Sequence, residues 1–165
     1  MRIAVCPGSF DPVTLGHLDI ISRASRIFEK IIVAIPVNPL KTASFTVEER
    51  MEMLRTVCEH EGLKNVEIDA VHGLLADYAK EKNAMVIIKG LRALSDFEYE
   101  FQQALTNKKL NPQLETMFLS TEAENMFLSS SVVKQVAGFG GDISHFVPEC
   151  LLETISRRLC NKVIG

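Results

Sequence analysis

The 165-residue chain has the size of one globular domain, and a composition of 47% hydrophobic and 24% charged residues excludes a disordered or fibrous protein. Its 18 Lys and Arg against 21 Asp and Glu give a formal charge of -3, which argues against a dedicated DNA- or RNA-binding surface. The apolar runs are too short to span a bilayer, and a strand-like run follows Arg2 directly, so we expect neither a membrane partner nor a secretory signal. The four cysteines form no CxxC pair, and we expect no disulfides. The sequence thus predicts a soluble cytoplasmic protein.

In chain order, runs typical of strands alternate with patterns typical of helices. The first part contains strand Ile3–Cys6, helix His17–Phe28, strand Ile31–Pro36 and helix Thr46–Glu61. Thr46 lies three residues before Glu49, a spacing that predicts a capping box. Most of the strand runs lack in/out alternation, which is typical of strands covered on both faces.

The same alternation continues to the end of the chain. The predicted elements are strand Val66–Ala70, helix Leu74–Lys82, strand Met85–Lys89, a helix opened by a capping box between Ser95 and Glu98, the weaker strand Glu115–Leu119, and helices Ser131–Gly138 and Pro148–Leu159. In the helix after Ser95 we expect four apolar residues to face the core: Phe97, Phe101, Ala104 and Leu105. The prediction is a single α/β domain over residues 1–165, doubly wound around a five-stranded parallel sheet.

The loop after the first strand has the residues that a phosphate site requires. It reads Pro7-Gly8-Ser9-Phe10-Asp11-Pro12-Val13-Thr14-Leu15-Gly16-His17. In a doubly wound sheet ligands bind at the carboxyl ends of the strands, and the helix that starts near Gly16 presents free N–H groups there. Ser9 adds a hydroxyl, and His17 can donate to a phosphate oxygen. A packed core histidine is the alternative for His17, but its place at a strand-to-helix junction favours the phosphate site.

Three further loops fall at the same edge of the sheet. They contain Lys41, then Lys89, Gly90 and Arg92, and finally Ser129–Ser131. Each basic residue alone is typical of a solvated face, and one serine is expected to cap the helix that follows. Three serines in a row exceed what a cap requires. The serines therefore indicate a second anion site, and the loops taken together are a stronger signal than any one of them.

The motifs resemble those of the bacterial phosphopantetheine adenylyltransferases, a family of the nucleotidyltransferase superfamily. Thr14-Leu15-Gly16-His17 matches the TxGH signature, and Lys89–Arg92, Asp96–Glu100 and Leu128–Ser131 narrow the match. The resemblance covers the whole chain and implies a Rossmann-like nucleotidyltransferase fold. It implies adenylyl transfer from ATP to 4'-phosphopantetheine in coenzyme A biosynthesis, which gives 3'-dephospho-CoA and pyrophosphate. It also implies a cytoplasmic, Mg²⁺-dependent homohexamer, with dephospho-CoA and CoA as product or inhibitor.

This reaction needs no general base, because the attacking phosphate monoester is already an oxyanion, so catalysis can rest on in-line positioning and charge stabilisation. We assign His17 to the transition state at the α-phosphate, and Ser9 and Lys41 to the incoming phosphate. Arg92 is assigned to the ATP polyphosphate and Lys89 to the phosphopantetheine side. Mg²⁺ is expected to be held by phosphates, with no metal ligand from the protein.

The resemblance also implies the remaining contacts. ATP would be bound by Ser9, Phe10, His17, Gly90, Leu91, Arg92, Glu100, Asn125, Met126, Phe127, Leu128, Ser129, Ser130 and Ser131, with the last three at the β- and γ-phosphates. The pantetheine arm would be bound by Leu75 and Asn107.

Five positions depart from the family pattern. They are Ser9 in place of Thr, Lys89 in place of Arg, Asn125 in place of an aromatic residue, Gln103 in place of an apolar residue, and Cys6 in place of Tyr. Ser9 keeps the hydroxyl of the usual Thr. Lys89 has a single ammonium group where the usual Arg has a guanidinium that can form two parallel hydrogen bonds. None of the five removes a catalytic group.

Two other functions are compatible with this fold. One is another small nucleotidyltransferase, which would act on nicotinamide mononucleotide or, with CTP, on glycerol 3-phosphate. Such families usually have Ser-Thr-Thr at the position of Ser129–Ser131, and they lack the Asp96–Glu100 run. The other is a catalytically silent nucleotide- or CoA-binding module, which would lack His17 or the serines. A metal site is not expected from His60, His72 and His145, because three or four converging ligands are required.

Overall fold

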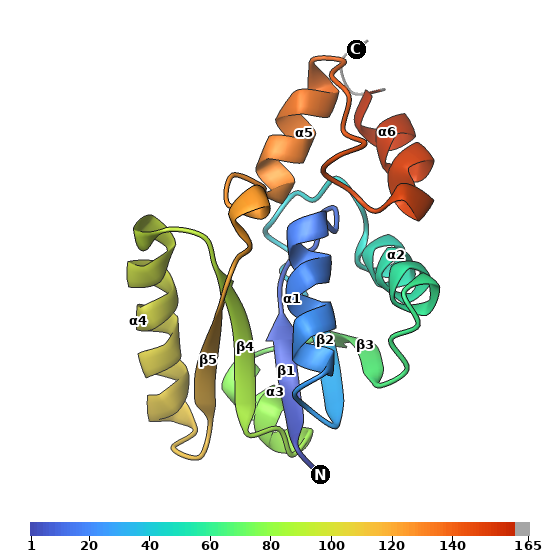
Figure 1. The fold of residues 1–165 in the computed structure, drawn as a ribbon. Helices are drawn as coiled ribbons and strands as arrows, with labels where there is room; N and C mark the ends of the chain where they lie inside the picture. Colours follow the sequence, from blue (N-terminus) through green and yellow to red (C-terminus); the bar gives the residue numbers. More distant parts are fainter. Residues whose placement is uncertain (161–165) are drawn as a thin grey trace.

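Five parallel strands form one sheet in the order β3-β2-β1-β4-β5 (Figure 1). The computed structural model describes residues 1–160, with the side chains of residues 94 and 95 excepted. The strands are β1 (Ile3–Pro7), β2 (Lys30–Pro36), β3 (Val66–Val71), β4 (Val86–Leu91) and β5 (Glu115–Ser120). β1 pairs with β2 on one side and with β4 on the other, so the winding direction reverses between β1 and β4. That reversal opens a crevice at the carboxyl ends of these two strands.

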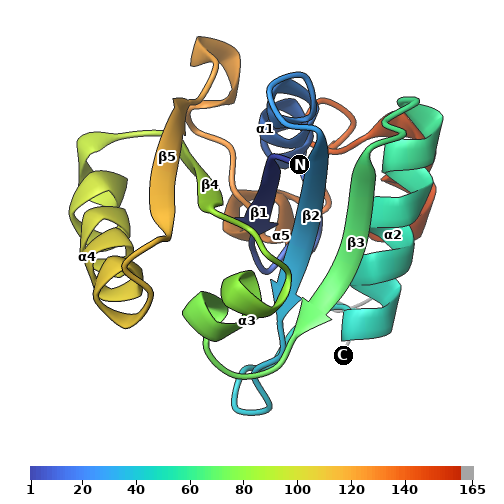
Figure 2. The ribbon, with the colours of Figure 1, turned by 90° about the horizontal axis from the view of Figure 1, so that it is seen from below.

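The helices cover both faces of the sheet, as predicted. They are α1 (Leu15–Ser25), α2 (Val47–His60), α3 (Leu75–Glu81), α4 (Leu94–Leu110), α5 (Ser130–Gly138) and α6 (Leu152–Cys160), with short 3-10 turns η1 (Ala123–Asn125) and η2 (Glu149–Leu151). Figure 2 shows α1 and α3 on opposite sides of the sheet. None of the described helices is long and apolar enough to cross a membrane.

The two faces of the sheet belong to two separate apolar cores, because successive residues of a strand point to opposite faces. On β1, Ala4 and Cys6 pack in the core that contains α1, α2, α5 and α6, whereas Val5 packs in the core that contains α3. On β4, Ile88 and Ile87 divide in the same way. Strands buried on both sides account for the continuous apolar runs in the sequence.

Two details of α4 differ from the prediction. The helix begins at Leu94 with Ala93 at its N-cap, so the capping box predicted for Ser95 and Glu98 is wrong. The apolar stripe is also not in the core: Phe97, Phe101 and Leu105 are 40%, 46% and 56% exposed. Phe97 stacks on Phe101 with ring centroids 5.4 Å apart, so the stripe forms an apolar surface of the single chain.

The other helix ends lie within a few residues of their predicted positions; the largest difference is at the last helix, where the 3-10 turn η2 precedes α6 and the helix starts at Leu152 and not at Pro148. The capping box of α2 is confirmed, since Thr46 Oγ1 accepts from the Glu49 N–H at 3.1 Å and Glu49 Oε2 accepts from the Thr46 N–H at 2.8 Å. α1 begins slightly earlier than predicted, at Leu15, because Thr14 is its N-cap.

Candidate active site

A cavity of about 230 Å³ opens at the carboxyl ends of β1 and β4. It is lined by residues of the loop after β1, the first turns of α1 and α4, the end of β4, and the segment that leads into α5. The predicted site residues that it brings together are Phe10, His17, Lys89, Gly90, Arg92, Glu100, Asn125, Leu128, Ser129 and Ser130. The first cavity is therefore the crevice expected at the reversal of the sheet.

A second cavity of about 340 Å³ adjoins the first, since Ser130 lines both. It brings together the predicted residues Ser9, Lys41, Ser130 and Ser131. It also contains three residues for which the sequence predicted no role, Asp11, Arg50 and Lys134. Of these, Lys134 was detectable from spacing, because it lies three residues after Ser131 and so shares a face of α5.

His17 is held by the residue that caps its own helix. The Thr14 N–H donates to His17 Nδ1 at 3.0 Å, and Thr14 Oγ1 accepts from the His17 N–H at 3.2 Å. Because Nδ1 is an acceptor, the neutral imidazole carries its proton on Nε2. The ring is further fixed by Phe10, whose ring meets it edge-on with centroids 5.0 Å apart. His17 thus offers the cavity one oriented N–H donor.

The surroundings of His17 keep its ring neutral. Burial and the nearby charges of Arg92 and Lys89 lower the pKa of His17 to about 4. Each of these disfavours the imidazolium, burial through loss of hydration and the two cations through repulsion. At neutral pH the ring is a neutral hydrogen-bond donor.

The lowered pKa predicts a pH dependence of stability that belongs to His17. The unfolded chain binds this proton near the ordinary value of 6.5 and the folded chain only near 4, so the free energy of unfolding should fall as the pH falls between these values. Denaturant unfolding at a series of pH values measures this slope. His17→Gln cannot titrate and should have a smaller slope in that interval. Equal slopes for the two proteins would contradict the assignment.

The two cations of the first cavity are each paired with a carboxylate. Arg92 Nε lies 3.1 Å from Asp96 Oδ2, and its NH1 donates to the Leu128 carbonyl at 3.0 Å. Lys89 Nζ lies 3.2 Å from Glu100 Oε2. Arg92 therefore connects the end of β4 to the segment before α5. The cations are held in place, and their charge is locally balanced.

The three serines before and in α5 have different partners. Ser129 is the N-cap, and its hydroxyl accepts from the Val132 N–H at 3.2 Å, which confirms that one serine is a cap. Ser130 Oγ donates to the Pro12 carbonyl at 2.8 Å and so ties α5 to the loop after β1. Ser131 is exposed and lines the second cavity.

Two glycines of the motifs are required by packing. A Cβ on Gly8 would lie 2.9 Å from the ring of Phe10, the residue that contacts His17. A Cβ on Gly90 would lie 3.0 Å from Ile20 Cγ1, so the absence of a side chain lets β4 approach α1 closely. Both glycines keep the walls of the first cavity close together.

Five predicted site residues lie outside the lining of both cavities: Leu75, Leu91, Asn107, Met126 and Phe127. Leu75 is the first residue of α3 and packs against the core on that face of the sheet. Phe127 is exposed and meets Phe146 edge-on at 5.6 Å. Their roles stay predictions.

Among the described residues, no group of three or more His, Cys, Asp or Glu side chains could hold a metal ion. The carboxylates that line the cavities are already engaged: Asp96 with Arg92, Glu100 with Lys89, and Asp11 with Lys134. A divalent cation at this site would therefore depend on oxygen ligands from the substrate.

The chain is similar to a known protein family and to several curated proteins. Residues 5–136 match the family model described as cytidylyltransferase-like. The chain is 54% identical over 158 residues to the phosphopantetheine adenylyltransferase of Caldanaerobacter subterraneus subsp. tengcongensis, which covers 96% of this chain and 98% of the relative. It is 59% identical over 149 residues to the phosphopantetheine adenylyltransferase of Carboxydothermus hydrogenoformans, with 90% and 91% covered.

Among solved structures, the chain is similar to Plasmodium falciparum nicotinic acid mononucleotide adenylyltransferase complexed with NaAD. The TM-score is 0.71 at 15% identity, with 94% of this chain and 95% of that chain covered. A structure of a nicotinate-nucleotide adenylyltransferase from Vibrio parahaemolyticus gives a TM-score of 0.67 at 19% identity, with 99% and 95% covered. At such identities the likeness shows the shared nucleotidyltransferase fold alone.

Proposed function

The chain belongs to the phosphopantetheine adenylyltransferase family, whose members are nucleotidyltransferases of coenzyme A biosynthesis, and from that membership we propose how its site works. The reaction is adenylyl transfer from ATP to 4'-phosphopantetheine, giving 3'-dephospho-CoA and pyrophosphate. The observation that carries the proposal is the neutral, oriented imidazole of His17, which lines the first of two adjoining cavities that both contain cations. A silent binding module would have no use for a donor fixed in this way.

The chemical step is a direct in-line displacement. A phosphate oxygen of phosphopantetheine attacks the α-phosphorus of ATP, a new P–O bond forms, and pyrophosphate leaves with the electron pair of the broken bond. No proton is transferred, since the nucleophile is already an oxyanion. His17 Nε2–H donates to the α-phosphate oxygens as negative charge develops on them, which is where a preorganised donor accelerates a reaction most.

The remaining residues bind and orient the two anions. Ser9 and Lys41 orient the attacking phosphate from the second cavity, and Lys89 holds the phosphopantetheine side of the first. Arg92 binds the ATP polyphosphate. The β- and γ-phosphates lie at the N-terminus of α5, where the positive end of the helix and the hydroxyls of Ser129 and Ser131 favour an anion. The Ser130 hydroxyl donates to the Pro12 carbonyl, so Ser130 contributes its main chain to this site. Mg²⁺ would be held mainly by the ATP phosphates and would neutralise part of their charge, since each carboxylate at the site lies beside a cation.

The experiment that tests the proposal measures pyrophosphate release from ATP and Mg²⁺ with a series of acceptors. We expect release with 4'-phosphopantetheine and none with nicotinamide mononucleotide. With CTP and glycerol 3-phosphate we also expect none. The structural neighbours act on pyridine nucleotides, whereas the relatives at 54% and 59% identity are phosphopantetheine enzymes, which favours the first acceptor. Release with nicotinamide mononucleotide alone would overturn the proposal.

We carry the homohexamer and the cytoplasmic location over from the family as further proposals, together with CoA as an inhibitor. The exposed apolar stripe of α4 supports an assembly, because Phe97, Phe101 and Leu105 would be buried against other copies. Light scattering should give a mass six times that of one chain. A monomeric mass would contradict the assembly.

A further inference from the structure

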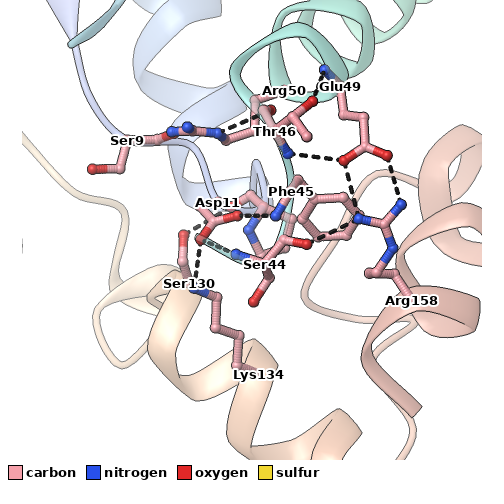
Figure 3. A network of polar contacts seen from close by, with 11 residues as sticks. Ser9, Asp11, Ser44, Phe45, Thr46, Glu49, Arg50, Ser130, Lys134 and Arg158 are labelled. Carbon is pink, nitrogen blue, oxygen red and sulfur yellow. Dashed lines mark hydrogen bonds and ion pairs between the residues drawn. The ribbon is translucent and has the colours of Figure 1, made fainter. Parts of the chain in front are cut away.

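The carboxylate of Asp11 lies where three segments of the site meet (Figure 3). Its Oδ2 accepts from the Ser44 N–H at 2.9 Å and lies 2.6 Å from Lys134 Nζ, and its Oδ1 accepts from the Phe45 N–H at 2.9 Å. Asp11 itself belongs to the loop after β1, Ser44 and Phe45 belong to the loop between β2 and α2, and Lys134 belongs to α5. One buried side chain therefore joins the three segments that line the second cavity.

Each of the three segments contributes a group that the proposed function uses. The loop after β1 contains Ser9, the loop between β2 and α2 contains Lys41, and α5 begins with the serines. Lys41 is exposed, and its side chain makes no hydrogen bond or ion pair with any residue that the structure describes. The position of its ammonium group therefore depends on where its loop is held.

The carboxylate is suited to hold that loop. Burial alone would raise the pKa of Asp11, but the hydrogen bonds from Lys134, Ser44 and Phe45 hold it below its ordinary value. Asp11 is thus ionised at neutral pH and accepts all three bonds. Hydrogen bonds to an ionised acceptor are stronger than neutral ones, which makes this a firm attachment for the loop.

A second contact fixes the other side of the same junction. Arg50, buried in the first turn of α2, donates to the Ser9 carbonyl at 2.8 Å and to the Thr46 carbonyl at 3.2 Å. Arg50 thus ties the start of α2 to the loop after β1 (Figure 3). Asp11 holds the segment that carries Lys41 from the side of the active-site loop.

We propose that Asp11 is a positioning residue that sets the place of Lys41 relative to Ser9 and the start of α5, and so determines the affinity for the attacking phosphate. The inference rests on the proposed function, since it concerns the phosphate-bearing acceptor of that reaction. Asp11 does not touch the reacting atoms. Its effect passes through the main-chain N–H groups of Ser44 and Phe45 to the loop, and through the loop to Lys41.

The test is a double-mutant cycle between Asp11→Asn and Lys41→Ala, with steady-state kinetics for both substrates. Asp11→Asn should raise KM for phosphopantetheine roughly tenfold and change KM for ATP less than threefold, because an amide cannot accept all three bonds. If Asp11 acts through Lys41, then Asp11→Asn should change that KM less than about twofold in the Lys41→Ala background. Equal factors in both backgrounds would overturn the proposal.

Asp69→Asn is the matched control for lost stability. Asp69 also accepts a backbone N–H, from Ala70 at 2.9 Å, and pairs with a lysine, Lys82, at 2.8 Å. It lies on β3, and it is not among the described residues that line either cavity. The Asp69→Asn substitution should lower the melting temperature and leave KM for phosphopantetheine unchanged. An Asp11→Asn protein that behaves in the same way would show that Asp11 is merely structural.

Two further measurements keep the test decisive. Asp11→Glu keeps the negative charge on a longer side chain. It should raise KM for phosphopantetheine less than Asp11→Asn does, and the increase should again depend on Lys41. This variant replaces Asp11→Asn in the test if Asp11→Asn does not fold. Amide hydrogen exchange of Ser44 and Phe45 should be faster in the Asp11 variants, and unchanged exchange would overturn the proposal. That measurement needs no substrate. If the wild-type protein releases no pyrophosphate, the proposed function fails while the exchange data still decide whether Asp11 holds the loop.

Discussion

Replacing His17 with Ala is expected to lower kcat at least about 100-fold and to change the affinity for ATP less than threefold. The imidazole offers one N–H to oxygens whose negative charge grows only as the new bond forms, so its removal costs the transition state more than bound ATP. Because the pKa of His17 is about 4, the ring is neutral at the pH of the assay and adds no net charge to ATP binding. Stopped-flow turnover and equilibrium ATP binding measure the two effects separately.

His60→Ala is the control for this variant, since His60 is exposed and pairs only with Glu61 at 3.4 Å among the described residues. It should retain wild-type turnover. A second variant, Thr14→Val, keeps the backbone N–H that donates to His17 Nδ1 but removes the hydroxyl that caps the helix. It should reduce turnover less than His17→Ala. A decrease of less than about tenfold for His17→Ala would contradict a role in the transition state.

The sheet was predictable because its strands are buried on both faces. Continuous apolar runs such as Ile31–Pro36 have few alternatives to a covered parallel strand, and the helices between them require right-handed crossovers. The Thr46–Glu49 capping box was predictable for a similar reason, since both partners lie within one turn. Local chemistry and burial point to the same structure in these segments.

Contacts between distant segments were not predictable from spacing. Asp11 and Lys134 are 123 positions apart, and nothing in either local sequence signals the pair. The exposure of Phe97 and Phe101 has a related cause, because an apolar stripe on a helix does not reveal whether the sheet or another surface covers it. The predicted core face of α4 was wrong for this reason.

The charge of the site also required the structure. The overall charge of -3 conceals a cationic site, as local reading of Lys41, Lys89 and Arg92 indicated. The structure adds two carboxylates at the same cavity, Asp96 and Glu100, each of which pairs with one of those cations. The site is therefore closer to neutral than its basic residues suggest. The hydrogen bond from Arg92 to Asp96 fixes the direction of the guanidinium. The contact of Lys89 with Glu100 is an ion pair only, since the buried Glu100 Oε2 has no hydrogen-bond partner among the described residues.

Arg92→Ala is expected to lower kcat/KM for ATP about 100-fold, because the variant loses three contributions of one side chain. It loses the guanidinium that binds the polyphosphate, it leaves Asp96 unpaired where it repels the nucleotide, and it frees the Leu128 carbonyl in the segment before α5. Arg92→Lys keeps the charge without the fork and should retain intermediate efficiency. Steady-state kinetics at varied ATP measure both.

Arg23→Ala separates this effect from general damage to the fold. Arg23 makes the same two kinds of contact as Arg92, with Asp19 at 3.0 Å and with the Ser120 carbonyl at 2.9 Å, but it is not among the described residues that line the cavities. It should keep wild-type kcat/KM. In Arg92→Ala the pKa of His17 should also rise above about 4, since burial remains but one of the two repelling cations is gone. An NMR titration of Arg92→Ala that gives the wild-type pKa of His17 would show that Arg92 does not act on His17. Equal losses of kcat/KM in Arg92→Ala and Arg23→Ala would show that Arg92 acts through the fold.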